Sequence, residues 1–249
     1  MFKKIYILWL RQIKRYLRSR SRIIGSLGQP LLFLLALGYG LGSVFQKAGQ
    51  GNYLDFLAPG IIGMSIIFTA IFSGIEIIWD RQFGFLKETM VAPVSRFEIM
   101  LGRTLGGATV GAIQGVIVFA LTLVVGFRPV NILMLPFAFL FTLLIGILFT
   151  SLGTAIASKL EDMQGFQVIM NFLVMPIFFL SGALFPLTGL PKAMDIITKI
   201  DPLTYGVDGL RGTLSNTWNF SLATDLIVLG IFAAVLLAIG SYLFSKIQI

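Results

Sequence analysis

Long apolar runs without a formal charge alternate along the chain with short segments rich in Lys and Arg. A helix that crosses the hydrocarbon core of a membrane needs about 20 predominantly apolar residues. Six runs meet this requirement, and we interpret each as one spanning helix. They are residues 23–46, 56–75, 104–127, a stretch within 129–158, a stretch that begins after residue 162 and includes NFLVMPIFFLSGALF, and 226–245. The pattern therefore predicts an all-α integral membrane protein with six transmembrane helices.

The composition supports this class and excludes several kinds of chemistry. Of the 249 residues, 57% are hydrophobic and 12% are charged, which is outside the range of a soluble domain. Neither Cys nor His occurs. This inventory excludes disulfides, thiolate or imidazole metal sites and any Ser/His or Cys/His nucleophile. We predict no catalytic residue and no metal site, and we treat residues 1–249 as a single transmembrane domain.

The basic residues predict how the spans are oriented. With the N-terminus in the cytoplasm, 14 of the 19 Lys and Arg residues fall in cytoplasmic segments and five fall outside. Cytoplasmic loops of membrane proteins carry an excess of these residues. We therefore expect both termini in the cytoplasm. The net charge of +8 reports this topology and does not require a nucleic-acid partner.

Residues 1–22 predict an amphipathic helix and not a cleaved signal peptide. Apolar side chains recur at steps of three and four residues, with Lys and Arg between them. Such a helix lies in the lipid headgroup region, apolar side down and cations toward anionic lipid. It serves either as a lipid anchor alone or also as a contact for a partner. No A-x-A cleavage site follows it.

Residues 80–100 form the long charged interruption between the second and third spans. Residues 82–89 contain no helix breaker except Gly84, so we expect a short helix there. Ser95 is a candidate N-cap, and Glu98, three residues later, completes a capping box that starts the third span. The segment is therefore expected to contain a short helix, a turn and a helix start.

This short helix carries more apolar surface than a solvated loop normally does. Phe83, Phe85, Leu86 and Lys87 are expected to project from the membrane surface. An exposed apolar cluster favours a protein–protein contact, with adhesion to the membrane as the alternative.

Residues 185–223 follow the fifth span and are too apolar for an ordinary external loop. Two helix starts are predicted, with Pro191 at a first helical position and Asp201 as an N-cap. Two ion pairs at helical spacing are also expected: Asp195 with Lys199 and Asp208 with Arg211. Two short helices that dip into the outer leaflet and return fit this segment better than a seventh span. The alternative is a folded external cap without a transport role.

Few polar side chains interrupt the spans. Gln114 is interpreted as an interhelical hydrogen-bonding residue. Gln167 and Asn171 lie four residues apart on one face of the fifth span, and either line a substrate path or hydrogen-bond across helices. Glu76 is the acidic residue nearest a span interior and a candidate cytoplasmic gate. It could also face water or pair with Arg81.

The chain resembles the membrane subunit of an ATP-binding-cassette exporter of the type-2 permease class. This group includes drug-resistance, nodulation-factor and polysaccharide exporters. The resemblance rests on the order and spacing of the basic amphipathic start, YLDFLAPGII, FLKETMVAPVSRFEIMLGR, and LSGALFPLTGLP followed by DPLTYGVDGLR. It implies a multi-pass protein of the plasma (inner) membrane with an N-terminal interface helix, a cytoplasmic coupling helix and a pair of external re-entrant helices.

The resemblance also implies roles for individual residues. The helix at residues 81–89 is similar to the coupling helix, which contacts an ATPase subunit. The implied coupling contacts are Gly84, Phe85, Leu86, Lys87 and Glu88. The implied interface-helix contacts are Trp9, Arg11 and Arg15. The implied substrate path between two permease copies is lined by Gln167, Asn171 and Phe172, and the implied external gate by Phe185, Pro186 and Tyr205.

No G-x-x-x-x-G-K-[ST] loop occurs, so another polypeptide must handle ATP if transport is active. We expect a transport subunit without enzyme activity or cofactor, two cassette ATPase subunits that hold ATP and Mg, a second permease copy in a homodimer, and surrounding lipid. The predicted function is export of a hydrophobic or amphipathic, drug-like or lipid-linked substrate by alternating access. The alternatives are a polysaccharide or glycoconjugate exporter, an ATP-independent secondary transporter or channel, and a lipid-acting membrane enzyme.

Overall fold

The computed structural model describes residues 2–47, 52–91 and 93–247, and these residues form helices and no strands. The helices are α1 (Phe2–Arg18), α2 (Arg20–Gly40), α3 (Gly42–Lys47), α4 (Tyr53–Phe72), α5 (Ile75–Gln82), α6 (Phe85–Val91), α7 (Arg96–Val125), the 3₁₀ turn η1 (Ile132–Met134), α8 (Leu135–Ala157), α9 (Met163–Leu180), α10 (Lys192–Ile200), α11 (Pro202–Ser215) and α12 (Leu222–Ser245). Among the described residues, six helical runs are long and apolar enough to cross a membrane: Arg20–Gly40, Tyr53–Gln82, Arg96–Val125, Ile132–Ala157, Met163–Leu180 and Leu222–Ser245. The predicted all-helical class and its six candidate spans are confirmed.

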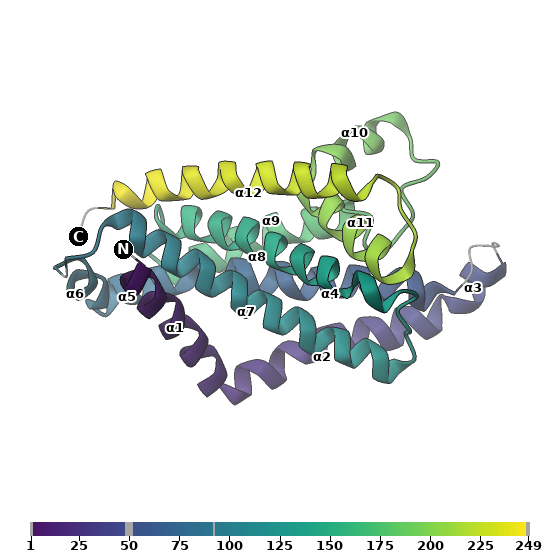
Figure 1. The fold of residues 1–249 in the computed structure, drawn as a ribbon, viewed down its shortest axis with the longest axis horizontal. Helices are drawn as coiled ribbons and strands as arrows, with labels where there is room; N and C mark the ends of the chain where they lie inside the picture. Colours follow the sequence, from purple (N-terminus) through teal and green to yellow (C-terminus); the bar gives the residue numbers. More distant parts are fainter. Residues whose placement is uncertain (1, 48–51, 92, 248–249) are drawn as a thin grey trace.

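The long helices run along the length of an elongated molecule (Figure 1). Helices α5 and α6 and both chain ends lie at one end, and α3, α10 and α11 lie toward the other. Helix α12 follows one long side, whereas α1 and α2 meet at an angle on the opposite side. The two ends of the bundle are therefore built from different short helices.

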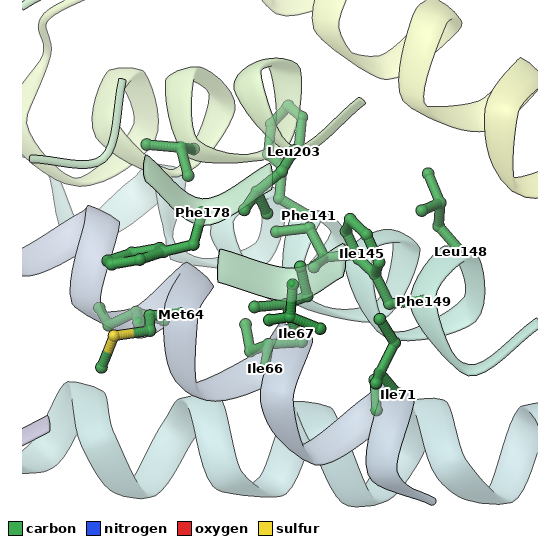
Figure 2. Close-up of a cluster of buried hydrophobic side chains, with 14 of the residues drawn as sticks. Met64, Ile66, Ile67, Ile71, Phe141, Ile145, Leu148, Phe149, Phe178 and Leu203 are labelled. Atoms are coloured by element: carbon green, nitrogen blue, oxygen red, sulfur yellow. The ribbon is translucent and has the colours of Figure 1, made fainter. Parts of the chain in front are cut away.

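Helix α4 is the centre of the bundle, because it packs against α2, α7, α8, α9 and α11. Residues 57–67 of this helix are all buried. Figure 2 shows its side chains meeting those of three neighbouring helices. The labelled residues are Met64, Ile66, Ile67 and Ile71 of α4, Phe141, Ile145, Leu148 and Phe149 of α8, Phe178 of α9 and Leu203 of α11.

Glycines let the backbones around α4 approach closely. A Cβ atom on Gly60 would lie 2.4 Å from the carbonyl oxygen of Ala183, which follows α9. A Cβ atom on Gly153 of α8 would lie 2.3 Å from the carbonyl oxygen of Ile71. Small residues permit such approach between helices in membranes, where burial against lipid supplies no drive for association. These contacts fix α4 against α8 and against the segment after α9.

The predicted helix starts are confirmed, with one shift of position. Ser95 Oγ accepts a hydrogen bond from the Glu98 backbone N–H at 3.2 Å, and the Glu98 carboxylate accepts one from the Ser95 N–H at 2.8 Å, which completes the capping box. Asp201 caps α11 by accepting from the Leu203 N–H at 2.9 Å. Pro191 is the N-cap of α10 and not its first helical residue.

The segment between α9 and α12 contains the two predicted short helices. Residues 203–214 of α11 are all buried, so α11 is an inner helix of the bundle. The Lys199–Asp195 ion pair is present at 2.8 Å. No Asp208–Arg211 ion pair is seen within the described part of the chain, because Asp208 instead accepts four hydrogen bonds from N–H groups of the α11–α12 connection. Burial raises the pKa of the α11 cap, Asp201, to about 7.

The predicted helix at residues 81–89 is wrong in its bounds. Helix α5 continues to Gln82, and α6 begins at Phe85. Between them Gly84 has a φ of 79°, a left-handed backbone conformation that glycine adopts without steric cost and that ends a helix. Gly84 is therefore the turn between two helices and not a residue within one.

The N-terminal boundaries also differ from the prediction. Helix α1 ends at Arg18, and Arg20 and Arg22 belong to the first turn of α2. The first span ends at Gly40, and the expected continuation to residue 46 is the separate helix α3. Closely spaced glycines, which are weak helix formers, explain a break at this position.

The close contact at Gly60 predicts a selective cost for a single methyl group. We expect Gly60→Ala to destabilise the protein by about 1–3 kcal/mol, because a backbone segment must move to accept the new Cβ atom. The matched control is Gly230→Ala in α12, where a Cβ atom would meet nothing within 4 Å. Thermal unfolding of both variants in detergent gives the comparison. Equal unfolding midpoints would contradict the close-approach argument.

Candidate functional site

A cavity of about 660 Å³ lies between α1 and the α5–α6 connection. We call it the basic groove. It is lined by Ile7, Leu10, Arg11, Lys14, Arg15, Arg18, Trp79, Asp80, Phe83 and Phe85. Four of these side chains carry a positive charge, one carries a negative charge and three are aromatic. The groove thus combines cations with apolar rings at the end of the molecule that holds both chain termini (Figure 1).

Glu76, the predicted gate residue, lies on α5 and is only 5% exposed. A buried carboxylate needs compensating cations or hydrogen bonds. Glu76 pairs with Arg15 of α1 at 3.5 Å and with Arg22 of α2 at 3.4 Å. The alternative pairing with Arg81 is not formed, because Arg81 donates to two backbone carbonyls after α8, both at 3.2 Å. Glu76 therefore connects three helices.

Asp80 lies one helical turn after Glu76 and is 4% exposed. It forms a buried ion pair with Arg103 of α7 and a second pair with Arg11 of α1 at 3.3 Å. Arg15 lies 3.9 Å from the same carboxylate. We call these two acids and their four arginines the ion cluster: Glu76, Asp80, Arg11, Arg15, Arg22 and Arg103. It joins α1, α2, α5 and α7.

Helix α1 is also bound to α7 by polar contacts. The Trp9 indole N–H donates to Thr109 Oγ at 3.0 Å, and the Tyr16 hydroxyl donates to Gln114 Oε1 at 2.6 Å. The interpretation of Gln114 as an interhelical hydrogen-bonding residue is confirmed. Trp9 faces α7 with its N–H, whereas Arg11 and Arg15 line the groove.

The expectation that the apolar side of α1 lies against lipid is only partly correct. One apolar stripe packs on α7, where Gly102 leaves space for Leu8 and where Ile5 is buried. A second stripe remains exposed and contains Phe2, Tyr6 and Leu17. Helix α1 therefore packs on the bundle with one edge and presents another apolar edge outward.

Helix α6 separates the predicted coupling residues into buried and exposed groups. Leu86 is fully buried and anchors the helix, so it offers no contact surface. Phe85 is 50% exposed, Phe83 is 59% exposed, and Glu88 is exposed. The side chain of Lys87 lies outside the part of the structure that is described.

Backbone carbonyls tie residues 80–100, which we call the elbow, to their surroundings. Lys4 of α1 donates to the carbonyl of Pro93, just before α7. Arg96 donates to the carbonyls of Ser245 and Ile247 at 2.7 and 2.8 Å, which fixes the start of α7 to the end of α12. The elbow is thus held on both sides of α6.

The other predicted site residues lie away from the basic groove. Gln167, Asn171 and Phe172 are exposed on the outer face of α9, and Phe172 is 83% exposed. Tyr205 is 8% exposed and donates to the Lys199 carbonyl at 2.8 Å.

Phe185 and Pro186, the other two proposed external-gate residues, are partly buried in the segment after α9. Pro186 lines a second cavity, but Phe185 and Tyr205 are not among the residues around that cavity. The structure does not gather the three residues at one cavity.

The ion cluster was not predicted from sequence, although a signal for it exists. Glu76 and Asp80 are four residues apart, as are Arg11 and Arg15. Such pairs share one helix face. The two helix faces have opposite charge, which could have suggested that the helices touch. The buried partner Arg103 could be identified only once the fold was known.

Comparison with known proteins agrees with this architecture. The profile of the family described as ABC-2 type transporter matches residues 3–215. The putative transport permease ycf38 of Cyanophora paradoxa is 32% identical, with 98% of this chain and 89% of that protein covered. Nodulation protein J of Rhizobium leguminosarum bv. trifolii is 29% identical, with coverage of 85% and 78%. The inner membrane transport permease YadH of Escherichia coli K12 is 25% identical, with coverage of 90% and 88%.

The match covers the ion cluster, the elbow and five of the six candidate spans in full. The match makes the chain a transport subunit of a family in which the ATPase is a separate subunit. The chain therefore belongs to the ABC-2 type transporter family, as a multi-pass membrane permease subunit.

Proposed function

We propose that this permease is the membrane half of an exporter and that its α5–α6 end faces the cytoplasm. The orientation is supported by the excess of Lys and Arg on that side of the six spans. Figure 1 places α5, α6 and both chain ends together. In this orientation α10 and α11 belong to the external end of an inner-membrane protein, where they would form the re-entrant pair.

The basic groove is the proposed docking site for one cassette ATPase subunit, and its composition is the observation that carries the proposal. Aromatic and Arg side chains are enriched at protein interfaces and dominate their binding energy. Here the half-exposed rings of Phe83 and Phe85 share a cavity with Arg11 and Arg15. Buried Leu86 holds α6 so that Phe85 and Glu88 face outward. Two cassette ATPase subunits, each holding ATP and Mg, would bind two permease copies.

The ion cluster is the proposed mechanical connection between the groove and the spans. An ATPase that displaced α6 would also displace α5, which directly precedes it in the chain. The buried pair of Asp80 with Arg103 and the pairs of Glu76 with α1 and α2 would carry this displacement into three further helices. Rigid-body tilting of the permease copies would then open the path outward.

Helices α2 and α9 are the proposed contact with a second copy of this chain. They expose large apolar side chains, including Leu32 of α2 and Phe172 of α9. Gln167 and Asn171 lie on the same outward side of α9 as Phe172 and would line the path of a homodimer. A wall that combines amides with an aromatic ring suits a hydrophobic or amphipathic, drug-like or lipid-linked cargo.

The docking proposal predicts that the exposed ring of α6 is needed for coupling. We expect Phe85→Ala to reduce permease-stimulated ATPase activity about tenfold or more, because loss of an aromatic anchor typically costs 2 kcal/mol or more (about 30-fold in binding). Glu88→Ala is expected to have a smaller effect in the same direction. The measurement uses the permease reconstituted in lipid with its cassette ATPase.

The matched control is Phe97→Ala, because Phe97 is also 50% exposed but does not line the groove. Its stimulation should remain near that of the native chain. If Phe85→Ala also retains full stimulation and binds the ATPase normally, the groove is not the docking site.

The ion cluster predicts a large effect of a nearly isosteric change. We expect Asp80→Asn to lower the free energy of unfolding by about 3–5 kcal/mol, because Arg103 loses its buried counter-charge. The exposed pair of α10 supplies the control: Asp195→Asn should cost about 1 kcal/mol or less. Thermal unfolding and ATPase stimulation below the unfolding midpoint are measured together.

The double variant Asp80→Asn/Arg103→Gln separates charge pairing from packing. It removes both charges and should recover part of the lost stability, since no unpaired guanidinium remains buried. A double variant less stable than Asp80→Asn alone would contradict the proposed pairing.

The orientation is testable with single cysteines, because the chain contains none. We expect Lys192→Cys, at the exposed start of α10, to react with a membrane-impermeant maleimide in intact spheroplasts. Val91→Cys, at the end of α6 and 87% exposed, should react only after the membrane is permeabilised. The cysteine-free chain is the control. The reverse labelling pattern would invert the topology.

A further inference from the structure

A second cavity, of about 370 Å³, lies at the end of the molecule opposite the basic groove. We call it the polar pocket. It is lined by Phe45 of α3, Asn52, Asp55 and Phe56 at the start of α4, Pro186 and Thr188 after α9, Arg211 and Ser215 of α11, and Thr217, Trp218 and Asn219 before α12. Its volume lies within the range of small-molecule sites, about 300–1,000 Å³. The docking of an ATPase does not use this pocket.

Arg211 is the most constrained group of the polar pocket. It is 2% exposed, and its guanidinium carbon lies 3.9 Å from the centre of the Phe56 ring. Its Nε–H donates to the Phe56 carbonyl at 3.4 Å, and Nη2 donates to the Gly182 carbonyl at 2.9 Å. Arginine has five N–H donors. Three of them therefore have no hydrogen-bond partner among the residues that the structure describes.

Further hydrogen-bonding groups around the pocket are also available. Within the described ranges, no partner is present for the hydroxyl groups of Thr188 and Thr217 or for the indole N–H of Trp218. Asn219 donates its backbone and side-chain N–H groups to Asp208, which leaves its amide oxygen as an acceptor. The pocket thus offers donors and acceptors together, and because Thr188, Thr217 and Asn219 are exposed, their free groups are accessible to a ligand.

The charges favour a neutral ligand. Asp55 and Arg211 both line the pocket, and Asp208, which does not line it, adds a negative charge near Arg211 on the same helix. An anion would meet the carboxylate of Asp55, and a cation would meet the guanidinium of Arg211. A neutral ligand that both donates and accepts hydrogen bonds avoids each repulsion.

Three aromatic side chains also line the polar pocket. Phe45, Phe56 and Trp218 contribute flat apolar surface beside the polar groups. A sugar ring matches this combination, because each hydroxyl donates one and accepts two hydrogen bonds while the C–H face of the ring is apolar. We propose that the polar pocket binds a neutral pyranose, either a free saccharide or the sugar of a glycolipid.

Sugar binding itself does not depend on the ATPase. Only the placement of the pocket outside the cell rests on the proposed function. Failure of sugar binding and failure of ATPase docking would therefore be distinguishable, since they concern opposite ends of the molecule.

The test uses the full chain in phosphatidylcholine nanodiscs, free of sugar-based detergent. Saturation-transfer NMR with methyl β-D-glucopyranoside should give a saturable signal, whereas methyl phosphate should give none. Arg211→Gln should weaken glucoside binding about tenfold or more, because a charged donor contributes about 1.5–3 kcal/mol. Thr217→Val preserves the shape of the side chain at an exposed position and removes its hydroxyl. It should weaken glucoside binding about fivefold, which corresponds to one neutral hydrogen bond of about 1 kcal/mol.

Thr224→Val is the matched control, because Thr224 is an exposed threonine at the same end that does not line the pocket. It should bind the glucoside as the native chain does. Thr217→Val keeps the proposal falsifiable if Arg211→Gln fails to fold.

A second arm separates the two sources of the sugar. Nanodiscs that contain monoglucosyl-diacylglycerol should raise the unfolding temperature of the native chain more than that of Thr217→Val if the sugar is carried by lipid. Binding of the free glucoside alone would identify a soluble saccharide. Binding of methyl phosphate in place of the glucoside, binding of neither sugar form, or native affinity in Thr217→Val would overturn the proposal.

Discussion

Two carboxylates one helical turn apart on α5 set a constraint that the end of this permease containing α5 and α6 must satisfy. Burial of Glu76 and Asp80 without counter-charges would cost several kcal/mol for each ion. Their partners come from α1, α2 and α7, so these helices must converge on α5. The basic groove results from the same convergence, since the arginines of α1 that reach the acids also form its wall.

One helical run connects this constraint with the other end of the molecule. The run of 30 residues from Tyr53 to Gln82 comprises α4 and α5, about 45 Å of helix. Its first turn contributes Asp55 and Phe56 to the polar pocket, and its last turns contribute Glu76 and Asp80 to the ion cluster. Because residues 57–67 are buried and held by close glycine contacts, α4 is expected to move as a rigid unit, and the turn at residues 73–74 connects its motion to α5.

The parts of this architecture that depend on local rules could be predicted from the sequence. Apolar length predicts the six spans, and the side chains of Ser95 and Asp201 predict two helix starts. Features that depend on distant partners could not be predicted in this way. From the sequence, Leu86 is expected at the surface, but the folded bundle covers it. Arg81 is expected to pair with Glu76, but in the structure it donates to two backbone carbonyls. The polar pocket could not be predicted for the same reason, because its residues come from five segments of the chain.

The distribution of these contacts also indicates which helices are free to move. In lipid, helices associate through close packing and polar contacts because burial of apolar surface supplies no additional drive. Helices α1, α4, α7, α8 and α12 share extensive contacts, glycine approaches and hydrogen bonds, and they form the rigid part of the subunit. Helix α9 touches its neighbours sparsely and exposes Phe172, and α2 is held mainly through α4, α7 and the Arg22 pair at its start. A second copy that packed on α2 and α9 would therefore contact the most weakly held spans, and motion of the rigid part could alter this interface without unfolding its own core.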